Sequence, residues 1–473
     1  MRKSGYLLLS IFLSYSSFAQ DKKAWTLEEC IHYALENNID VRQQGQNVQM
    51  ADYNRDANSA NFFPNLTFSS GYNWNFGYNI DPVTNLPSSA NRQTGNFSLS
   101  SQWVLFDGLA NVNQLRQGRI DYLAATYQLE SIKNDITVNI SSTYLQILMN
   151  KEIAAVALEQ KNTSALMLES SKAQYDAGSI AYGDYLQAES QLASDEQRLI
   201  QAQNNVTLSI LSLAQLLQLE DPTSFDVVSP ELDLPAGSVL ARTPTDIYTT
   251  AREVQPIVKA SELNIQSAQY SLYQSQSSYW PTISLQAAIS TNYSNRIFAY
   301  EGVSDQTIPI GFWNNSGSAV PVYTTTSVPY GRYSKNFGTQ FSDNLNEYVG
   351  VNLVWPIFSR FQIRNRVRQQ EFAVSQAELE LDRVENQLRQ TIQKAHADAQ
   401  ASLKSYTASS KAAEAAEESL DYARIRREEG AISQYEYESA RNNYLAAKSQ
   451  QLQSKYDYIF KVRVLEFYLT NQL

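Results

Sequence analysis

The chain contains an internal duplication, and this repeat restricts the possible folds more than any other feature. Residues 27–64 align without a gap with residues 244–281, at a shift of 217 positions. Residues 106–217 align in the same way with residues 358–469, at a shift of 252 positions. The two halves therefore have the same order of elements, and the second half carries 35 extra residues in its middle. A repeat of this kind predicts one structural unit that occurs twice.

Each half contains two segments in which apolar and polar side chains alternate. In residues 65–80 the even positions are almost all apolar or aromatic, whereas the odd positions are Asn, Thr, Ser or Gly. Alternation is typical of a β-strand with one apolar face, because successive side chains of a strand point to opposite faces. The same pattern predicts further strands at about 96–106, 282–294 and 347–357.

Most of the remaining sequence is predicted to be helical, with a long helical hairpin in each half. Residues 109–174 contain no proline and only one glycine, which predicts a helix roughly 100 Å long at about 1.5 Å per residue. A turn at Gly178 then reverses the chain into a helix at 184–219, in which every seventh residue from Leu192 to Leu213 is apolar, as in a coiled coil. The equivalent turn of the second half is expected at Gly430.

The expected domain organisation follows from the repeat. Residues 1–19 have the layout of a secretory signal peptide, with two basic residues, a short apolar run and small residues before a cleavage point. The first repeat then covers residues 20–219, an acidic, proline-containing linker covers 220–243, and the second repeat covers 244–473. The extra residues of the second half fall in a long loop at 295–346.

Composition argues against several classes of protein. The formal net charge is −11, which makes nucleic acid an unsuitable partner. Cys30 is the only cysteine, so no intrachain disulfide is expected, and after the signal peptide no run of 18 apolar residues could form a transmembrane helix. His32 and His396 are isolated, and no phosphate-binding loop, metal-ligand cluster or nucleophile motif is present. We therefore expect no enzymatic activity, no cofactor and no metal site.

The alternating strands favour a sheet that faces lipid. A soluble sheet with one face on a core would alternate in the same way, but these strands reach the ~9–11 residues that cross a bilayer. Their aromatic residues are typical of the girdle of a membrane barrel, namely Tyr72, Trp74, Phe76, Trp103 and Trp355. An open sheet edge cannot lie in lipid, and closed barrels begin at about eight strands. Several chains must therefore share one barrel: three chains would supply twelve strands, two would supply eight and four would supply sixteen.

Three pairs of short motifs occur in the same order in both halves. They are Phe63-Pro64-Asn65-Leu66 with Trp280-Pro281-Thr282-Ile283, Leu105-Phe106-Asp107-Gly108 with Ile357-Phe358-Ser359-Arg360, and Tyr175-Asp176-Ala177-Gly178-Ser179-Ile180 with Glu429-Gly430-Ala431-Ile432-Ser433. With these motifs the chain resembles the TolC family of outer-membrane efflux proteins over residues 25–469. The resemblance implies a mainly α-helical fold with a membrane β-barrel part. It implies a homotrimer with a twelve-stranded barrel in the outer membrane and a long periplasmic α-barrel.

The resemblance also implies partners and a function. The partners would be a periplasmic adaptor (membrane fusion) protein, an inner-membrane pump of the RND or ABC type, and outer-membrane lipid. The expected function is the outer-membrane exit duct of a tripartite efflux system, which passively conducts small molecules from the periplasm and the pump to the exterior. The exit duct of a type I protein secretion system is one alternative. A periplasmic coiled-coil structural protein without a channel is another, but it leaves the four strands unexplained.

Two groups of site residues come from the same resemblance. The helical turns would be the periplasmic tips that dock onto the adaptor, with contacts from Gly178, Ser179, Ile180, Gly430, Ala431 and Ile432. A pore constriction would lie close to these tips. Asp184 and Glu436 stand where the family often has acids, Ser439 replaces a second acid, and Arg427 replaces a tyrosine of the family's gate. We hypothesise that Arg427 pairs with Asp184 to close the gate, and a solvated charged helix face is the structural alternative.

Overall fold

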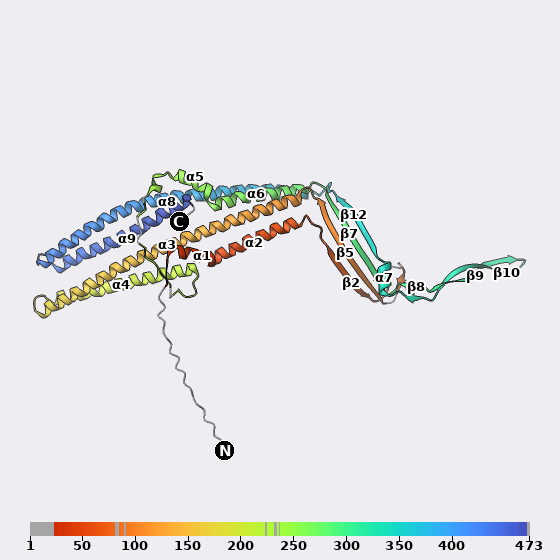
Figure 1. Ribbon diagram of the computed structural model, residues 1–473, viewed down its shortest axis with the longest axis horizontal. Helices are drawn as coiled ribbons and strands as arrows, with labels where there is room; N and C mark the ends of the chain where they lie inside the picture. Colours follow the sequence, from red (N-terminus) through yellow and green to blue (C-terminus); the bar gives the residue numbers. More distant parts are fainter. Residues whose placement is uncertain are drawn as a thin grey trace, which may run out of the picture. The chain divides into compact units, whose positions relative to one another are not determined.

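The computed structural model describes residues 23–80, 85–88, 91–222, 225–230, 234–235 and 237–470. The expected signal peptide at residues 1–19 lies outside the described residues. The chain divides into two compact units (Figure 1). One unit consists of Met1–Asp52, Ile120–Gln266 and Ser375–Leu473, and the other consists of Tyr53–Arg119 and Ser267–Val374.

Two long helical hairpins confirm the duplication. Helix α3 (Ala110–Asp176) with α4 (Tyr182–Leu217) forms the first, and α8 (Gln362–Glu428) with α9 (Gln434–Thr470) forms the second. Both α3 and α8 contain 67 residues, which corresponds to the predicted length of roughly 100 Å. Over the described ranges, no helix combines the length and the apolar character that a membrane span requires.

Shorter helices precede the first strand of each half, and they also occur as matched pairs. They are α1 (Leu27–Asn37), α2 (Ile39–Ala60), α5 (Pro244–Val254) and α6 (Pro256–Ser277). Thr26 and Thr243 begin the first helix of each pair, because each hydroxyl accepts a hydrogen bond from the backbone N–H three residues later, at 3.2 Å. Asn38 and Gln255 interrupt the two pairs at equivalent positions.

Two hydrophobic cores lie in the helical unit, and equivalent positions of the repeat build both of them. The matched residues are Cys30 and Ile247, Ala34 and Ala251, Ile140 and Ile392, and Leu213 and Leu465. The first core also contains Phe225 and Val227 from a small parallel ladder of β1 (Lys23–Trp25) and β6 (Phe225–Val227). Each large aliphatic side chain buried in this way contributes about 1.5–3 kcal/mol, so the shared positions explain why both halves keep the same arrangement.

The second unit contains an antiparallel sheet of four strands in the order β12-β7-β5-β2. The strands are β2 (Thr67–Asn75), β5 (Arg92–Phe106), β7 (Thr282–Ser294) and β12 (Asn346–Val354), which confirms the four predicted strands. The segment predicted at 65–80 is shorter than expected because Gly77 adopts a φ of +100°. After this glycine the chain forms a short ladder of β3 (Asn79–Ile80) with β4 (Pro87–Ser88).

The expectation of a long loop at 295–346 is wrong, because these residues form four strands and a helix. Strands β9 (Gly302–Asn315) and β10 (Ser318–Tyr330) pair as a long hairpin, which joins the sheet through the short pair β8 (Phe298–Ala299) and β11 (Tyr333–Ser334) (Figure 1). Helix α7 (Phe337–Asp343) then packs against β7. Its buried Gln340 side chain accepts a hydrogen bond from the Ser294 N–H at 2.9 Å, which fixes the helix to the end of the strand.

Candidate functional site

The register of the sheet brings the apolar side chains of all four strands onto one face. Leu99 of β5 pairs with Phe68 of β2 on one side and with Ile289 of β7 on the other. This apolar face comprises Phe68, Tyr72, Trp74, Phe97, Leu99, Trp103, Ile283, Leu285, Ile289, Val349, Val351 and Leu353, with Gln93 and Glu347 near the strand ends. Much of the face is uncovered in the single chain: Val349 is 75% exposed and Phe68 is 66% exposed. A continuous apolar surface of this kind indicates contact with a partner or a membrane.

The opposite face of the sheet is polar. Ser100 of β5 pairs with Thr67 and with Ala288, and the other members are mainly hydroxyl and amide residues: Ser69, Asn73, Asn96, Ser98, Gln102, Ser284, Gln286, Ser290, Asn292 and Asn352. In the described part of the chain the outer edges of β2 and β12 have no strand beside them. The sheet therefore has one face for an apolar medium, one face for water, and two edges that can accept further strands.

The predicted girdle residues lie toward both ends of the apolar face. Trp103 donates its indole N–H to the Phe62 carbonyl at 2.8 Å, and Trp355 donates to the Tyr279 carbonyl at 3.2 Å, at equivalent points of the two halves. Toward the other end, the ring of Tyr72 lies 4.8 Å from the ring of Trp74. Phe76 follows β2 and is 73% exposed.

The two helical turns have the same backbone geometry. Gly178 and Gly430 have φ values of +73° and +72°, in the left-handed region where glycine is favoured. The Ser179 N–H donates to the Gln174 carbonyl at 2.9 Å, and the Ala431 N–H donates to the Arg426 carbonyl at 2.8 Å. This pattern is a standard helix C-terminus, in which glycine is the favoured residue.

The side chains around the two turns differ. At the first turn Tyr175, Tyr182 and Tyr185 form an aromatic cluster with ring centroids 5.4–6.0 Å apart. At the second turn the helix ends on a run of charged residues, Arg424, Arg426, Arg427, Glu428 and Glu429. The sequence predicts both turns but not the tyrosine cluster, although the spacing of the three tyrosines across Gly178 is visible in the sequence.

The acids expected at the constriction lie in the first turns of α4 and α9. The Asp184 carboxylate accepts a hydrogen bond from the Ala181 N–H at 3.3 Å. The Glu436 carboxylate accepts from the N–H and the hydroxyl of Ser433, at 2.9 Å and 3.0 Å, and these bonds lower the pKa of Glu436. Both acids and Ser439 are exposed in the single chain.

Arg427 contacts Tyr437 and Met167 of the same chain, and not the expected partner Asp184. Its guanidinium lies 4.8 Å from the ring centroid of Tyr437, and Nη1 is 3.8 Å from Sδ of Met167. Within the described residues of one chain it does not pair with Asp184. The proposed pair of Arg427 and Asp184 is therefore a hypothesis about contacts between neighbouring chains.

A buried ionic cluster, which the sequence patterns do not predict, connects the two repeats. Arg441 of α9 is 2% exposed and donates to Asp195 Oδ2 of α4 at 2.5 Å and to Glu438 Oε2 at 2.7 Å. The same guanidinium donates to the hydroxyl of Ser164 of α3 at 2.5 Å, and Ser164 in turn donates to Asp195. Gln191 donates to both carboxylate oxygens of Asp195 at 3.2 Å. The cluster thus holds α3, α4 and α9 together.

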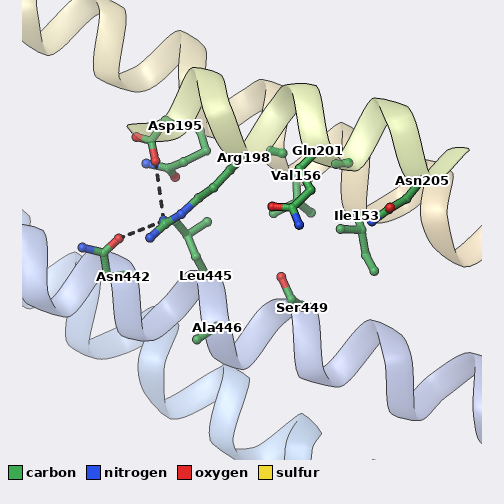
Figure 2. Close-up of a pocket in the computed structure, with 13 residues that line it drawn as sticks. Ile153, Val156, Asp195, Arg198, Gln201, Asn205, Asn442, Leu445, Ala446 and Ser449 are labelled. Carbon is green, nitrogen blue, oxygen red and sulfur yellow. Dashed lines mark hydrogen bonds and ion pairs between the residues drawn. The ribbon is translucent and has the colours of Figure 1, made fainter. Parts of the chain in front are cut away.

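A groove of about 320 Å³ lies beside this cluster, between α3, α4 and α9 (Figure 2). Arg198 extends from α4 and donates to Asn442 Oδ1 of α9 at 3.1 Å, with its Nη1 3.6 Å from Asp195 Oδ1. Unlike Arg441, its side chain is half exposed. Asp195 therefore contacts one buried and one exposed arginine.

Self-comparison of the sequence could not reveal this cluster because it exists in only one copy. The positions equivalent to Asp195 and Ser164 in the second repeat are Ala447 and Ala416, and the position equivalent to Arg441 in the first is Glu189. A second signal was available. Every seventh residue from Ala188 to Ser209 is buried in α4, and Asp195 is the one acid in this stripe of small residues. No group of His, Cys, Asp and Glu suited to a metal ion occurs among the described residues.

Comparison with known proteins yields one family and a set of similar structures. The model of the family described as "Outer membrane efflux protein" matches residues 30–218 and 324–469. The outer membrane efflux protein BepC of Brucella suis biovar 1 is 22% identical over 441 residues, which cover 92% of this chain and 83% of BepC. The outer membrane protein TolC of Vibrio cholerae is 25% identical over 207 residues, which cover 43% of this chain and 46% of TolC.

Solved structures share the fold at low sequence identity. The outer membrane protein VceC of Vibrio cholerae superimposes with a TM-score of 0.71 at 15% identity, covering 94% of this chain and 95% of VceC. The outer-membrane channel OprN superimposes with a TM-score of 0.68 at 19% identity, covering 94% of this chain and 89% of OprN. The predicted mainly helical fold with a strand region is therefore confirmed.

Proposed function

This chain belongs to the outer membrane efflux protein family and is located in the outer membrane, and from that premise we propose that several copies form the exit duct of a tripartite efflux system. The duct conducts small molecules passively from the periplasm and an inner-membrane pump to the exterior. The observation that carries this proposal is the two-faced sheet with two open edges. Strands in lipid must close into a barrel because unpaired backbone groups are not tolerated there.

The dimensions of the apolar face support a membrane location for the sheet. Gln93, the partner of Trp74, and Trp103 are ten residues apart on β5, which corresponds to ~33 Å along a strand. A strand tilted by about 35–45° would project this length to ~23–27 Å, close to the ~25 Å apolar band of membrane barrels. The aromatic residues thus lie where the two membrane interfaces would be.

The number of strands argues against two copies, and the resemblance to the TolC family selects three copies over four. Two chains would supply eight strands, and a barrel of about eight strands has an interior that side chains fill. Three chains would supply twelve, which leaves a water-filled lumen lined by the polar face. We therefore propose a homotrimer with a shared twelve-stranded barrel, whose helical hairpins extend into the periplasm.

The helical turns are the proposed contact with the periplasmic adaptor. Both are exposed, and added Cβ atoms at Gly178 and Gly430 would meet no atom within 4 Å, so the surface is open to a partner. Bulky or charged substitutions of Ser179 or Ala431 should abolish efflux while leaving the oligomer intact. Unchanged drug resistance of cells carrying these variants would contradict the docking role.

The acids Asp184 and Glu436 would each form a ring of three near these turns and favour cations in the pore.

A matched pair of substitutions tests the membrane sheet. Leu99 and Ser100 are neighbours on β5 but lie on opposite faces. Leu99→Arg should destabilise the inserted protein by ~2–4 kcal/mol, because it places a charge against lipid near mid-membrane. Ser100→Arg should insert normally and alter only the ion selectivity of the channel in planar bilayers.

Both variants are compared by their amounts in isolated outer membranes, together with electron microscopy of the detergent-purified wild type. Equal insertion of Leu99→Arg and Ser100→Arg, or a monomeric wild type that is soluble without detergent, would overturn the proposed function.

A further inference from the structure

The β9/β10 hairpin is a long ribbon that no layer from the described part of the chain covers. Its thirteen cross-strand pairs run from Gly302 with Tyr330 to Asn315 with Ser318, and the hairpin joins the rest of the unit through β8 and β11 (Figure 1). All its described side chains are exposed or only partly buried. An isolated two-stranded ribbon is at best marginally stable in water, so a hairpin of this length requires a partner surface.

One face of this hairpin is free of charge. The register places Ile308, Trp313, Val320 and Val322 on the same face, with an irregularity in the pairing at Ile310. Trp313 is 61% exposed in the single chain. The only charged residue of the hairpin, Asp305, pairs with Ser327 on the opposite face. We call these surfaces the uncharged face and the Asp305 face.

The charge content indicates what kind of partner fits. Residues 302–330 contain one charged side chain in 29, whereas 18% of the whole chain is charged. A basic or acidic partner would find no complementary charge here. A second copy of the same hairpin meets no electrostatic repulsion on its uncharged face, in contrast to the rest of a chain whose net charge is −11.

The contact would be made through side chains rather than through added strands. Pro309, Pro321 and Pro329 lie within the two strands, and proline has no N–H to offer to a neighbouring strand. Proline on an exposed edge is a common device against strand addition. Both faces of the hairpin then remain for association, and only the uncharged face avoids placing the Asp305 carboxylates of two copies against each other.

We propose that the uncharged face of the β9/β10 hairpin packs against the same hairpin of neighbouring copies, as a subunit contact separate from the barrel. The inference rests on the proposed shared barrel, because the barrel brings identical hairpins to one end of the assembly. The occupant of the exposed face is then a second copy of this chain, held at high local concentration.

The test uses the full-length protein in native outer membranes. Trp313→p-benzoylphenylalanine places a photo-crosslinker on the uncharged face. Illumination is expected to give covalent dimers and trimers, and the crosslinked peptides should map to residues 302–330 of a second chain. Denaturation in sodium dodecyl sulfate before illumination is the control, and it should remove these products.

Two further substitutions decide which face is used. Val322→Asp in the crosslinker background adds one charge per copy to the uncharged face and should lower the yield of dimers and trimers at least about tenfold, the effect of roughly 1.4 kcal/mol. Thr325→Asp adds the same charge to the Asp305 face and should leave the yield unchanged.

Crosslinks only to lipid, to residues outside 302–330 or to no second chain would overturn the hairpin contact. Electron microscopy of the same preparation keeps the two proposals distinct. An oligomeric channel without hairpin crosslinks refutes only this inference, whereas a monomer refutes the proposed function.

Discussion

Replacement of the buried Arg441 gives the most direct test of how the two repeats are held together. Arg441→Ala removes the cation that contacts Asp195, Glu438 and Ser164 and leaves two buried carboxylates. Removing one partner of a buried ion pair typically costs about 3–5 kcal/mol, because the remaining charge is no longer compensated. Arg198 still lies 3.6 Å from Asp195, so we expect a loss near the lower end, about 3 kcal/mol.

Arg198→Ala is the matched control for burial. It removes the same charge from the same aspartate, but the Arg198 side chain is 51% exposed and that of Arg441 is 2% exposed. Exposed ion pairs contribute about 0–1 kcal/mol, so Arg198→Ala should cost less than about 1 kcal/mol. Arg441→Lys should fall between the two variants because an ammonium group cannot reproduce the forked contacts of the guanidinium.

The free energy of unfolding is measured by urea denaturation in detergent, followed through the helical circular dichroism signal. The comparison requires equal dependence of the free energy on urea in all variants, which shows that the same surface is exposed. Equal stability of Arg441→Ala and Arg198→Ala would refute the reasoning, since burial is what separates the two arginines. So would a fully stable Arg441→Ala variant with intact α4 and α9 helices.

Three further predictions concern single residues. Gly178→Ala should destabilise the helical hairpin by about 1–2 kcal/mol in the same urea assay, because Gly178 has a φ of +73°. Gly183→Ala is the control, because Gly183 lies in α4 and an added Cβ would meet no neighbour. This variant should be neutral or stabilising by up to about 1 kcal/mol. Cys30 is buried, and burial raises its thiol pKa to about 12, so it should resist maleimide at pH 8 until the protein is denatured. Because the thiol pKa is raised in the folded state, the contribution of Cys30 to stability is fully present below about pH 9. It should decline as the pH rises toward 12. Cys30→Ala should remove the part of the decline in stability that comes from this thiol. Finally, Arg427→Ala should increase the planar-bilayer conductance if the arginine helps to close the pore, while Arg427→Lys should stay close to wild type; identical conductance in all three proteins would remove Arg427 from the gate.

Much of the fold could be predicted from the sequence because its patterns are strong and occur twice. Strand β7 is predicted at its observed bounds, since Ile283, Leu285 and Ile289 lie on one face and Ser284, Gln286 and Ser290 on the other. The long helices were recognisable because residues 109–174 contain no proline. Repetition also meant that an ambiguous segment in one half could be checked against the other.

The β9/β10 hairpin could not be predicted from the same reasoning. The irregular pairing at Ile310 shifts the alternation of apolar residues, and three prolines lie within its strands. Its turn at Ser316 and Gly317, both with positive φ, was the one local signal for a hairpin. The Arg441 cluster escaped detection for a different reason, because its residues have no counterparts in the other repeat and their contacts join helices distant in sequence.

The different chemistry of the two helical turns has a consequence for stoichiometry. In a trimer the six turns would alternate between the tyrosine-rich surface around Gly178 and the charged surface around Gly430. The backbone of such a trimer would have nearly sixfold symmetry, but its side chains would have only threefold symmetry. A partner that recognises one kind of surface would find three equivalent positions, and six identical partner subunits would have to bind in two distinct ways. If Tyr175, Tyr182 and Tyr185 are exchanged for the residues of the second turn, binding should therefore change for half of the six partner subunits.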